Sequence, residues 1–571
     1  MKRSYRTPML RARRGVVERP IIAWDLETTP IPSAFGDEVR ITPLYFTAYD
    51  GERLWSRPLR GFDDLRIRLL EVFDAAPARA RFVAWNGNRF DNRLALLALR
   101  DEETVLIEPY LTRQLSLRGA RVTIGEKIVE LCDGIAMLGQ SCSLAEFVQR
   151  YAPELPKGSI DWEKERFDAS DPTHRAYAER DSIALYHAMT RAIAQVQEFS
   201  GLAIGPTIGN LGIRYLESIL PEGVKIWPVP ERVGEWLTRS GMRGGLVLSP
   251  RPYRGPIWQY DLNQAYAGVL RSGWYPCGGG VWTRTFVAGA PGFYVGTLSR
   301  ATHAPIPYYV RDLETTKGVE TVGAPVRCVL ASCEVSMLRR FGWSFAIEQG
   351  YVWEEQFRLT EAVRHLERAR RDAPGGPKGA LGSVIKAIGC NMYGKTVERT
   401  EDRRIVFRGM CPEGFASLDG GVLSESLWVA PSEDSRKHYH RPQIGATITA
   451  QVRCITYRAA MQRPKAFVKA DTDSVAFSEP VALPESSWRY GRWKTEYAGV
   501  EAIVKGKKLY ALANGTVRAK GLDRRELSFE TFARWWDEGI VPSTISVQLL
   551  RIGKDSPESM YHILKRRAQR E

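Results

Sequence analysis

The sequence lacks several features that would assign it to common classes of protein. No run of about 18 apolar residues occurs, so no membrane-spanning helix is predicted, and no signal-peptide pattern opens the chain. The eight cysteines include no Cys-x-x-Cys pair, which excludes a typical zinc site and fits reduced thiols in a bacterial or host cytoplasm. Internal repeats and long low-complexity linkers are also missing. These absences predict a globular chain of closely packed domains.

Size and charge narrow the class further. A chain of 571 residues is too long for one domain and predicts three to five structural units. The 81 basic and 66 acidic residues leave a net charge of +15, so a polyanion is the expected partner. Part of this excess lies in residues 1–19, which we interpret as a basic tail. A solvated tail is favoured there over an arm that contacts DNA.

Two carboxylates one residue apart, Asp471 and Asp473, lie between apolar, β-prone flanks in residues 468–477. On a strand they would share a face, and in a tight turn they would share its tip, so their charges converge in either case. A divalent metal bound by hard oxygen ligands relieves such repulsion. Taken alone, however, Asp-Thr-Asp-Ser is more often an ordinary hairpin turn. The choice between a metal site and an ordinary turn therefore depends on the other motifs of the chain.

Three further blocks accompany these aspartates. Asp261 ends an apolar, strand-like segment, and Tyr266 follows it by five residues. Lys386 and Tyr393, seven residues apart, are predicted to share one helical face, where a cation and an aromatic ring suit a nucleoside triphosphate. Residues 507–510 and 518–522 add cations beside an aromatic ring. The four blocks together predict a site for phosphates, a base and a metal.

A second set of carboxylates lies near the N-terminus. The apolar strand at 21–24 leads into Asp25 and Glu27, which share a strand face, and a second apolar strand leads to Asp91. Tyr177 and Asp181 are four residues apart on a predicted helix and point the same way. Four such carboxylates could hold two metals about 4 Å apart, as in phosphodiester hydrolysis.

These motifs, in this order, resemble those of family B DNA polymerases, which read DxxSLYP, KxxxNSxYG, DTDS and KxY. The N-terminal set resembles their proofreading 3′-5′ exonuclease in its tyrosine-bearing (DEDDy) form. The segment 155–162, which contains Lys157, is similar to the lysine-bearing segment of the protein-primed branch found in small linear-genome phages. The resemblance covers about residues 20–530. It implies an α/β and α+β multidomain fold: a ribonuclease H-like exonuclease followed by a right-hand palm, fingers and thumb.

The sequence departs from the family pattern at several positions. Gln264 and Ala267 replace the serine and proline of the first polymerase motif, and Cys390 with Asn391 replaces Asn-Ser in the second. Met242 stands where the family has the tyrosine of its Tyr-x-Gly-Gly loop. The metal-binding aspartates and both active-site tyrosines remain. We therefore expect activity to survive, with nucleotide affinity or fidelity altered.

The resemblance implies a role for each motif residue. Polymerase catalysis is assigned to Asp261, Asp471 and Asp473. The implied nucleotide-binding residues are Leu262, Tyr266, Lys386 and Tyr393. The implied exonuclease residues are Asp25, Glu27, Asp91, Asp181, Tyr177 and Lys157. The implied DNA-binding residues are Gly244, Gly245, Thr28, Asn86, Phe90, Lys508, Tyr510 and Lys520. Each site would hold two Mg²⁺ ions, with Mn²⁺ as a substitute, on Asp261, Leu262 and Asp473 or on Asp25, Glu27, Asp91 and Asp181.

The expected domains follow from the motif positions. They are a tail at 1–19, the exonuclease at 20–195, a linker and first palm part at 196–274, an insertion at 275–356, fingers at 357–395, a hairpin insertion at 396–443, palm at 444–500, and palm end with thumb at 501–571. The protein-primed branch contacts its priming protein through the first insertion. In the second, an ordinary surface excursion is nearly as well supported as a hairpin.

The sequence thus predicts a DNA polymerase with proofreading activity that replicates a linear viral or mobile-element genome by protein priming. The expected partners are primer-template DNA, deoxynucleoside triphosphates, a terminal protein and a single-stranded DNA-binding protein, with the enzyme acting as a monomer away from membranes. Two alternatives stay open. One is a family B polymerase that uses ordinary primers or none. The other is a nuclease of the same carboxylate type whose C-terminal half only binds DNA.

Overall fold

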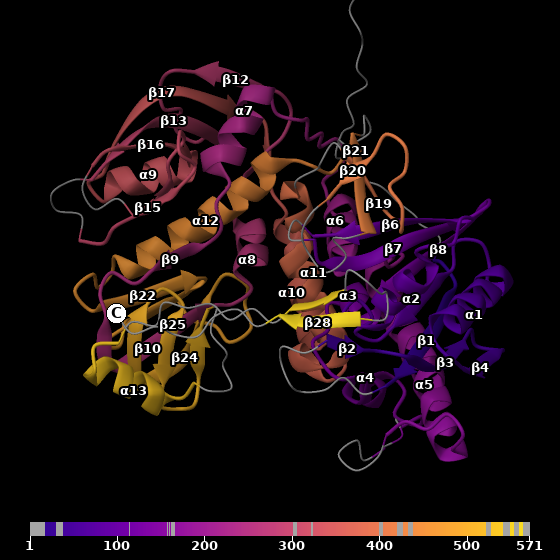
Figure 1. Ribbon diagram of the computed structural model, residues 1–571. Helices are drawn as coiled ribbons and strands as arrows, with labels where there is room; N and C mark the ends of the chain where they lie inside the picture. Colours follow the sequence, from indigo (N-terminus) through magenta and orange to yellow (C-terminus); the bar gives the residue numbers. More distant parts are fainter. Residues whose placement is uncertain are drawn as a thin grey trace, which may run out of the picture.

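The computed structural model describes residues 18–29, 38–112, 115–156, 158, 160, 166–300, 305–320, 324–398, 403–418, 426–431, 438–520, 527–540, 549–552 and 559–563. Each half of the sequence forms a seven-stranded sheet, and a separate four-stranded sheet lies beside the second of these (Figure 1). Lys157 and most of the basic tail lie outside the described residues. Within the described part, no helix is both long and apolar enough to span a membrane.

The N-terminal sheet has the strand order β4-β3-β1-β5-β8-β7-β6. Its three central strands β1, β5 and β8 are parallel and the outer ones antiparallel. Its strands are β1 (Ile21–Thr28), β3 (Pro43–Tyr49), β4 (Leu54–Pro58), β5 (Arg81–Ala84), β6 (Val105–Leu111), β7 (Leu117–Ile124) and β8 (Lys127–Asp133). Its helices are α1 (Phe62–Ala75), α2 (Asp91–Leu99), α3 (Gly134–Leu138), α4 (Leu144–Tyr151) and α5 (Pro172–Ser200).

Alternation along β1 sorts its side chains between two cores. Ile22 and Trp24 pack in a core with residues of α1 and α2, whereas Ile21 and Ala23 belong to a core that includes α4 and α5. Successive strand side chains point to opposite faces of a sheet. Asp25, two residues beyond Ala23, is therefore directed towards the face that carries α5.

The second seven-stranded sheet has the order β26-β25-β24-β10-β23-β22-β9, and all its pairings are antiparallel. Helices α8 and α12 pack against one another beside it (Figure 1). The strands are β9 (Leu246–Leu248), β10 (Tyr253–Leu262), β22 (Phe467–Thr472), β23 (Ser474–Phe477), β24 (Trp493–Gly506), β25 (Leu509–Leu512) and β26 (Val517–Ala519). The helices before and around it are α6 (Ile208–Ser218), α7 (Glu231–Trp236), the π-helix η1 (Leu237–Gly241), α8 (Ala265–Ser272) and α12 (Pro442–Ala460).

Residues between α8 and the next helical pair form the separate sheet, in the order β12-β17-β13-β16, with α9 against it. This part contains β11 (Tyr275–Pro276), β12 (Gly280–Thr283), β13 (Gly292–Ser299), β14 (Tyr309–Arg311), β15 (Gly318–Glu320), β16 (Val326–Ala331), α9 (Ser332–Arg340), β17 (Ser344–Trp353) and β18 (Gln356–Phe357). These short strands fall in the region predicted as an insertion.

Two helices, α10 (Thr360–Asp372) and α11 (Ala380–Asn391), form a pair in the region predicted as fingers, 357–395. Gly375 and Gly376, both at positive φ, turn the chain between them. The 3₁₀ turns η2 (Gly376–Lys378) and η3 (Gly394–Val397) flank α11. Beyond them, β19 (Arg403–Phe407) pairs with β21 (Leu427–Pro431), and β20 (Ala416–Ser417) pairs with β21 as well. These strands lie in the region predicted as a hairpin insertion, 396–443, part of which lies outside the described residues.

The C-terminal part contains α13 (Phe529–Asp537), β27 (Leu549–Ile552) and β28 (Ser559–Ile563). Strand β28 pairs with β2 (Glu38–Arg40), so a three-stranded sheet joins segments from the two ends of the chain (Figure 1).

Candidate active sites

The hairpin of β22 and β23 carries the paired aspartates at its tip. Asp471 pairs with Ser474, which leaves Thr472 and Asp473 as the two turn residues. Thr472 has a φ of 65°, a left-handed conformation that a β-branched residue rarely adopts. The Asp473 N–H donates to the Asp471 carbonyl oxygen at 2.8 Å. Of the two arrangements that the sequence allowed, the structure thus has the turn.

Asp261 lies next to this turn, near the end of β10, where it pairs with Ser474. The Leu262 N–H donates to the Asp473 carbonyl oxygen at 2.7 Å, which fixes the two strand ends against each other. Burial, together with the charges of Asp261 and Asp471, raises the pKa of Asp473 from 3.8 to about 6. The three carboxylates therefore repel one another, as expected of a site built for a cation.

Two lysines approach these carboxylates from the neighbouring strands. The Lys494 Nζ lies 3.0 Å from Asp261, and the Lys508 Nζ lies 2.8 Å from Asp471. Asp471, Asp473, Lys508 and Tyr510 line a cavity of about 280 Å³. Lys520 is exposed at the end of this unit, and its N–H donates to the Lys508 carbonyl oxygen at 3.1 Å. Both predicted primer-binding residues of this segment, Lys508 and Tyr510, thus border the aspartates.

A buried lysine beneath the cavity was missed in the sequence. Lys469 on β22 is 3% exposed, and its Nζ lies 3.9 Å from the centroid of the Tyr510 ring and 2.8 Å from the Gln259 Oε1. Burial lowers the pKa of Lys469 to about 8. Its signal in the sequence was a single cation inside an otherwise apolar strand. Lys469 supports the ring of Tyr510 from below.

The predicted nucleotide-binding residues meet at the ends of α8 and α11. The rings of Tyr266 and Tyr393 have centroids 4.5 Å apart. Tyr393 lies two residues beyond the end of α11 at Asn391, but Met392 and Tyr393 keep right-handed helical dihedral angles, so the shared face with Lys386 stays a prediction. Lys386 is exposed on α11. The two tyrosines are nevertheless brought together, as the motifs require.

Two departures from the family motifs contact each other. The Cys390 Sγ donates to the Gln264 Oε1 at 3.5 Å, across the contact between α11 and the start of α8. Gln264 has a φ of 47° and directly precedes α8. The two substituted residues, Gln264 and Cys390, are therefore in contact, which neither motif indicates by itself.

The glycine pair lies against the catalytic turn. A β-carbon on Gly245 would stand 2.5 Å from the Thr472 Cγ2 and 2.6 Å from its Cα, so only glycine fits there. Gly244 is exposed, and its carbonyl oxygen accepts a hydrogen bond from the Arg453 Nη1 at 2.9 Å. The π-helix η1 ends just before this loop, a placement frequent at functional sites.

A buried ionic cluster holds this loop in place. The fully buried Glu334 of α9 accepts hydrogen bonds from Arg243 at 2.7 Å, Arg453 at 2.9 Å and the Tyr308 hydroxyl at 2.6 Å. Burial alone would raise the pKa of Glu334, but the charges of Arg243 and Arg453 outweigh it and lower the pKa to about 2. The cluster joins the insertion, α12 and the glycine loop. Its members are too far apart in the chain for any sequence motif to connect them.

The N-terminal carboxylates lie on three elements, β1, α2 and α5. Asp25 and Glu27 lie on one face of β1 and pair with Thr47 and Tyr45 of β3. Asp181 and Tyr177 lie on α5, 3% and 9% exposed. Asp91 begins α2, and burial together with the charge of Asp25 raises its pKa well above the usual range. The structure thus brings Asp91 and Asp25 close enough to interact.

The surroundings of this second site add one carboxylate that the sequence did not single out. Asp133, buried at the end of β8, accepts the Asn88 N–H at 3.1 Å, and its charge also raises the pKa of Asp91. A β-carbon on Gly158 would lie 3.0 Å from the Tyr177 ring, so the segment next to Lys157 packs on that tyrosine. The other predicted DNA-binding residues of this site are Thr28, half-buried at the end of β1, exposed Asn86 and half-buried Phe90.

The donor chemistry of both sites suits a hard divalent cation, because every predicted side-chain ligand is a carboxylate oxygen. Within the described residues, however, no three or more acidic, histidine or cysteine side chains converge as a ready-made metal cage. What the described residues offer is two pairs, Asp261 with Asp473 and Asp25 with Asp91, in which burial and then the charge of the partner raise the pKa of one member. Each pair fits an ion that would offset that repulsion.

Comparison with solved structures identifies the arrangement of these units. The phi29 DNA polymerase in its ternary complex with primer-template DNA and incoming nucleotide superposes with a TM-score of 0.71 over 96% of this chain and 99% of that chain, at 15% identity. The chain has the phi29 DNA polymerase fold. The same polymerase with single-stranded DNA gives a TM-score of 0.68 over 95% of this chain and 99% of that chain, at 15% identity. The predicted multidomain fold class is confirmed.

Sequence comparison adds one relative. The DNA-directed DNA polymerase of Enterobacteria phage PRD1 is 30% identical over 136 residues, which are 23% of this chain and 24% of that protein. The match thus spans about a quarter of the relative's length. A search of known protein families finds no match. Together with the phi29 fold, the PRD1 match confirms the resemblance to phage DNA polymerases that the motifs predicted.

Proposed function

We propose that the chain is a family B DNA-directed DNA polymerase with its own 3′-5′ exonuclease. It replicates a linear viral or mobile-element genome by protein priming in the host cytoplasm. The observation that carries this proposal is the position of Asp261, on β10, beside the hairpin turn that bears Asp471 and Asp473, in a chain with the phi29 polymerase fold. The PRD1 similarity supports the same conclusion.

In the polymerase site, Asp261, Asp473 and the Leu262 carbonyl would hold two Mg²⁺ ions, or Mn²⁺ as a substitute, aided by Asp471. Such ions lower the pKa of the primer 3′ hydroxyl and neutralise charge on the triphosphate. Lys386 grips the phosphates, and Lys508 with Tyr510 supports the primer terminus. Tyr266 lies under the sugar, and Tyr393 packs beside the new base pair.

In the exonuclease site, Asp25, Glu27, Asp91 and Asp181 would hold the second pair of ions, and the chemistry that such ions would supply is activation of water and stabilisation of the leaving oxygen. Tyr177 orients that water, and Lys157 neutralises the scissile phosphate. The frayed primer end is held by Thr28, Asn86 and Phe90, at the ends of β1 and before α2. Proofreading therefore uses residues of a sheet that the polymerase site does not share.

The partners are primer-template DNA, deoxynucleoside triphosphates, a terminal protein and a single-stranded DNA-binding protein, and the enzyme acts as a monomer. The four-stranded sheet and α9, within 275–356, form the surface for the terminal protein. Purified enzyme given terminal protein, radiolabelled nucleotide and Mg²⁺ should label a serine, threonine or tyrosine of that protein. Absence of label with normal extension of DNA primers would favour a polymerase that uses ordinary primers.

Primer extension tests the central assignment. Asp473→Asn and Asp261→Asn should each abolish nucleotide addition, because each removes one charge from the metal-binding set, while degradation of single-stranded primer ends continues. Asn preserves the side-chain volume, so a folding defect is not expected. Near-parental extension by either variant would refute the site. A parent protein that degrades DNA but never extends it would instead favour a nuclease with a DNA-binding C-terminal half.

A further inference from the structure

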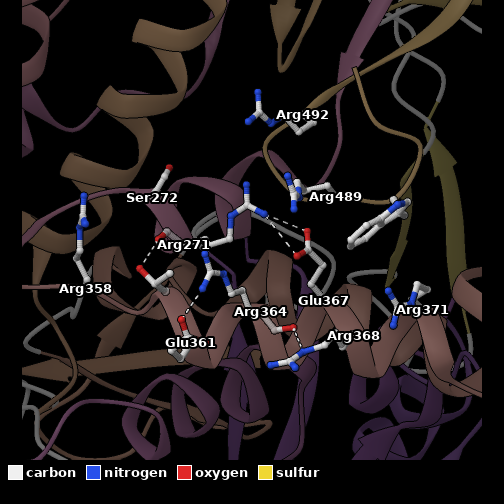
Figure 2. A pocket seen from close by; sticks show the side chains of 12 residues that line it. Arg271, Ser272, Arg358, Glu361, Arg364, Glu367, Arg368, Arg371, Arg489 and Arg492 are labelled. Atoms are coloured by element: carbon white, nitrogen blue, oxygen red, sulfur yellow. Dashed lines mark hydrogen bonds and ion pairs between the residues drawn. The ribbon is translucent and has the colours of Figure 1, made fainter. Parts of the chain in front are cut away.

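A basic pocket lies between α10, the C-terminal end of α8 and the loop that precedes β24 (Figure 2). Its volume is about 590 Å³, and seven of its twelve lining residues are arginines. It has no lining residue in common with the cavity at Asp471 and Asp473. The pocket is therefore a separate feature, which the proposed chemistry does not use.

The positive charge of this pocket is only partly neutralised. Two glutamates line it: Glu367 pairs with Arg271 at 3.3 Å, and Glu361 pairs with Arg364 at 2.6 Å. Arg371 also pairs with Asp372, which lies outside the lining, at 2.7 Å, so seven arginines against three carboxylates leave an excess of four positive charges. Among the described residues, no carboxylate lies within 4.0 Å of Arg368 or Arg489. Both residues are exposed, and although the Arg368 Nε donates to the Arg364 carbonyl oxygen at 3.3 Å, its Nη groups have no carboxylate partner in the described part of the chain.

The arginines project from elements that are fixed to the core. The loop of Arg489 and Arg492 is tied to the residue after Leu262: the Asn263 N–H donates to the Arg492 carbonyl oxygen at 2.9 Å, and the Gly491 N–H donates to the Asn263 carbonyl oxygen at 2.7 Å. The Tyr490 N–H donates to Glu367 of α10. Both walls of the pocket are thus held at a set distance, so like charges stay together without a ligand.

Exposed tryptophans flank the arginines. Arg358 lies 4.0 Å over the ring of Trp274, which is 44% exposed. Trp488 is 40% exposed, with Arg371 and Arg489 at 5.2 and 5.6 Å from its ring centroid. Interleaved cations and aromatic rings suit a strand whose phosphates and unstacked bases are both accessible.

We propose that this pocket binds a short run of single-stranded nucleic acid. From its first residue, Thr360, to Arg371, α10 spans about 17 Å at 1.5 Å per residue, longer than one triphosphate requires and suited to successive phosphates. The arginines contact the phosphodiester backbone, and Trp488 stacks on a base. This site goes beyond the proposed catalytic function, because its binding can be measured without nucleotide addition.

Salt-dependent binding tests the proposal. The triple variant Arg364→Ala, Arg368→Ala, Arg371→Ala is compared with Arg53→Ala, Arg57→Ala, Arg60→Ala, which removes equal charge from the exposed end of the N-terminal sheet. Affinity for a fluorescent oligothymidylate is followed by anisotropy over a salt series. Each lost phosphate contact should lower the log-log slope by about 0.7, or about two in total. The control should keep the parental slope, and both variants should keep the parental melting temperature.

A stacking variant and a crosslink locate the strand. Trp488→Ala should weaken binding about fivefold to a hundredfold without changing the salt slope, since stacking releases no counterions. An oligonucleotide bearing 4-thiothymidine should crosslink to α10 or to residues 484–492. An unchanged slope in the triple variant, or crosslinks confined to other segments, would overturn the proposal. It would also be overturned if the triple variant lost affinity for free pyrophosphate but not for the oligonucleotide.

The result is separable from the catalytic proposal. Extension of a primer across a one-nucleotide template overhang, at saturating DNA, should stay within about twofold of the parent in the triple variant, because no residue of the polymerase cavity is changed. Failure of the parent to extend primers would refute the polymerase assignment and leave the binding result intact.

Discussion

At the scale of single residues, the polymerase site holds like charges together at a cost in stability. Asp473 lies between Asp261 and Asp471, and its raised pKa measures how strongly the folded chain disfavours its ionised form. Lys494 and Lys508 offset only part of that repulsion from the rim. A site poised in this way to accept a cation is expected to fold less stably than a neutral version.

The first residue-scale prediction follows from the sign of this shift. A carboxyl group whose folded pKa of about 6 exceeds its unfolded value of 3.8 destabilises the fold progressively as the pH rises between these values. Asp473→Asn should therefore raise the free energy of unfolding at pH 8 in chelator by up to about 3 kcal/mol. At pH 3 the gain should disappear. Urea melts at both pH values measure this, and an equal effect at both would contradict the charge argument.

The second residue-scale prediction concerns the selection of the nucleotide sugar by Tyr266. Its ring lies against Tyr393, and a rigid ring beneath the nucleotide sugar would leave no room for a 2′ hydroxyl. Tyr266→Val should lower the preference for deoxynucleotides over ribonucleotides about a hundredfold, by analogy with the cost of overpacking. The measurement is the ratio of kcat/KM for the two substrates. A parallel loss of both activities would mean that Tyr266 only fills space.

At the scale of elements, the insertion is tied to the catalytic hairpin through one buried charge. Glu334 of α9 holds Arg243 and Arg453, Arg453 holds the carbonyl oxygens of Arg243 and Gly244, and Gly245 touches Thr472. Three elements that are distant in sequence, α9, α12 and the glycine loop, are therefore held against one another by this cluster. A shift of α9 would be transmitted to the turn that bears Asp473.

Glu334→Gln tests this link. Neutralising the carboxylate leaves two buried arginines without a counter-charge, which should cost about 3 to 5 kcal/mol in the free energy of unfolding. The expected readouts are a lower urea midpoint and a larger fall in primer extension than in exonuclease activity. Glu348→Gln, which breaks an exposed pair with Arg327, serves as the matched control and should change stability by less than about 1 kcal/mol. Equal losses of the two activities would refute the link to the hairpin.

The elements also explain what the sequence could predict. The strand before Asp25 was predicted, and the β22–β23 turn was one of two predicted arrangements, because their patterns are local. The roles of their residues remain predictions. Glu334 and Lys469 were missed because their partners lie on strands and helices that only the tertiary fold brings near. Propensity also does not fix where a helix ends, and α11 stops at Asn391, two residues before Tyr393.

At the scale of the whole molecule, two carboxylate sites lie on separate sheets. Asp25→Ala with Glu27→Ala should abolish shortening of labelled single strands, preserve extension, and raise the error rate, because the change leaves the second sheet untouched. The double variant Asp63→Ala, Asp64→Ala at the start of α1 is the control and should shorten strands normally. Continued shortening at the parental rate in the first variant would place the nuclease elsewhere.

The shared core has a consequence for how such a chain can be inherited. Leu185 of α5 belongs to the same continuous core as Ile388 of α11 and Ile448 of α12. A protein segment that recombination can transfer between genes must fold with a polar, solvent-compatible surface. A fragment that ended after α5 would expose an apolar surface to solvent, and we expect it to aggregate before it could function. The N-terminal part with its carboxylate site and the C-terminal part with its own are therefore expected to be inherited together, even though each site is proposed to carry out a different reaction.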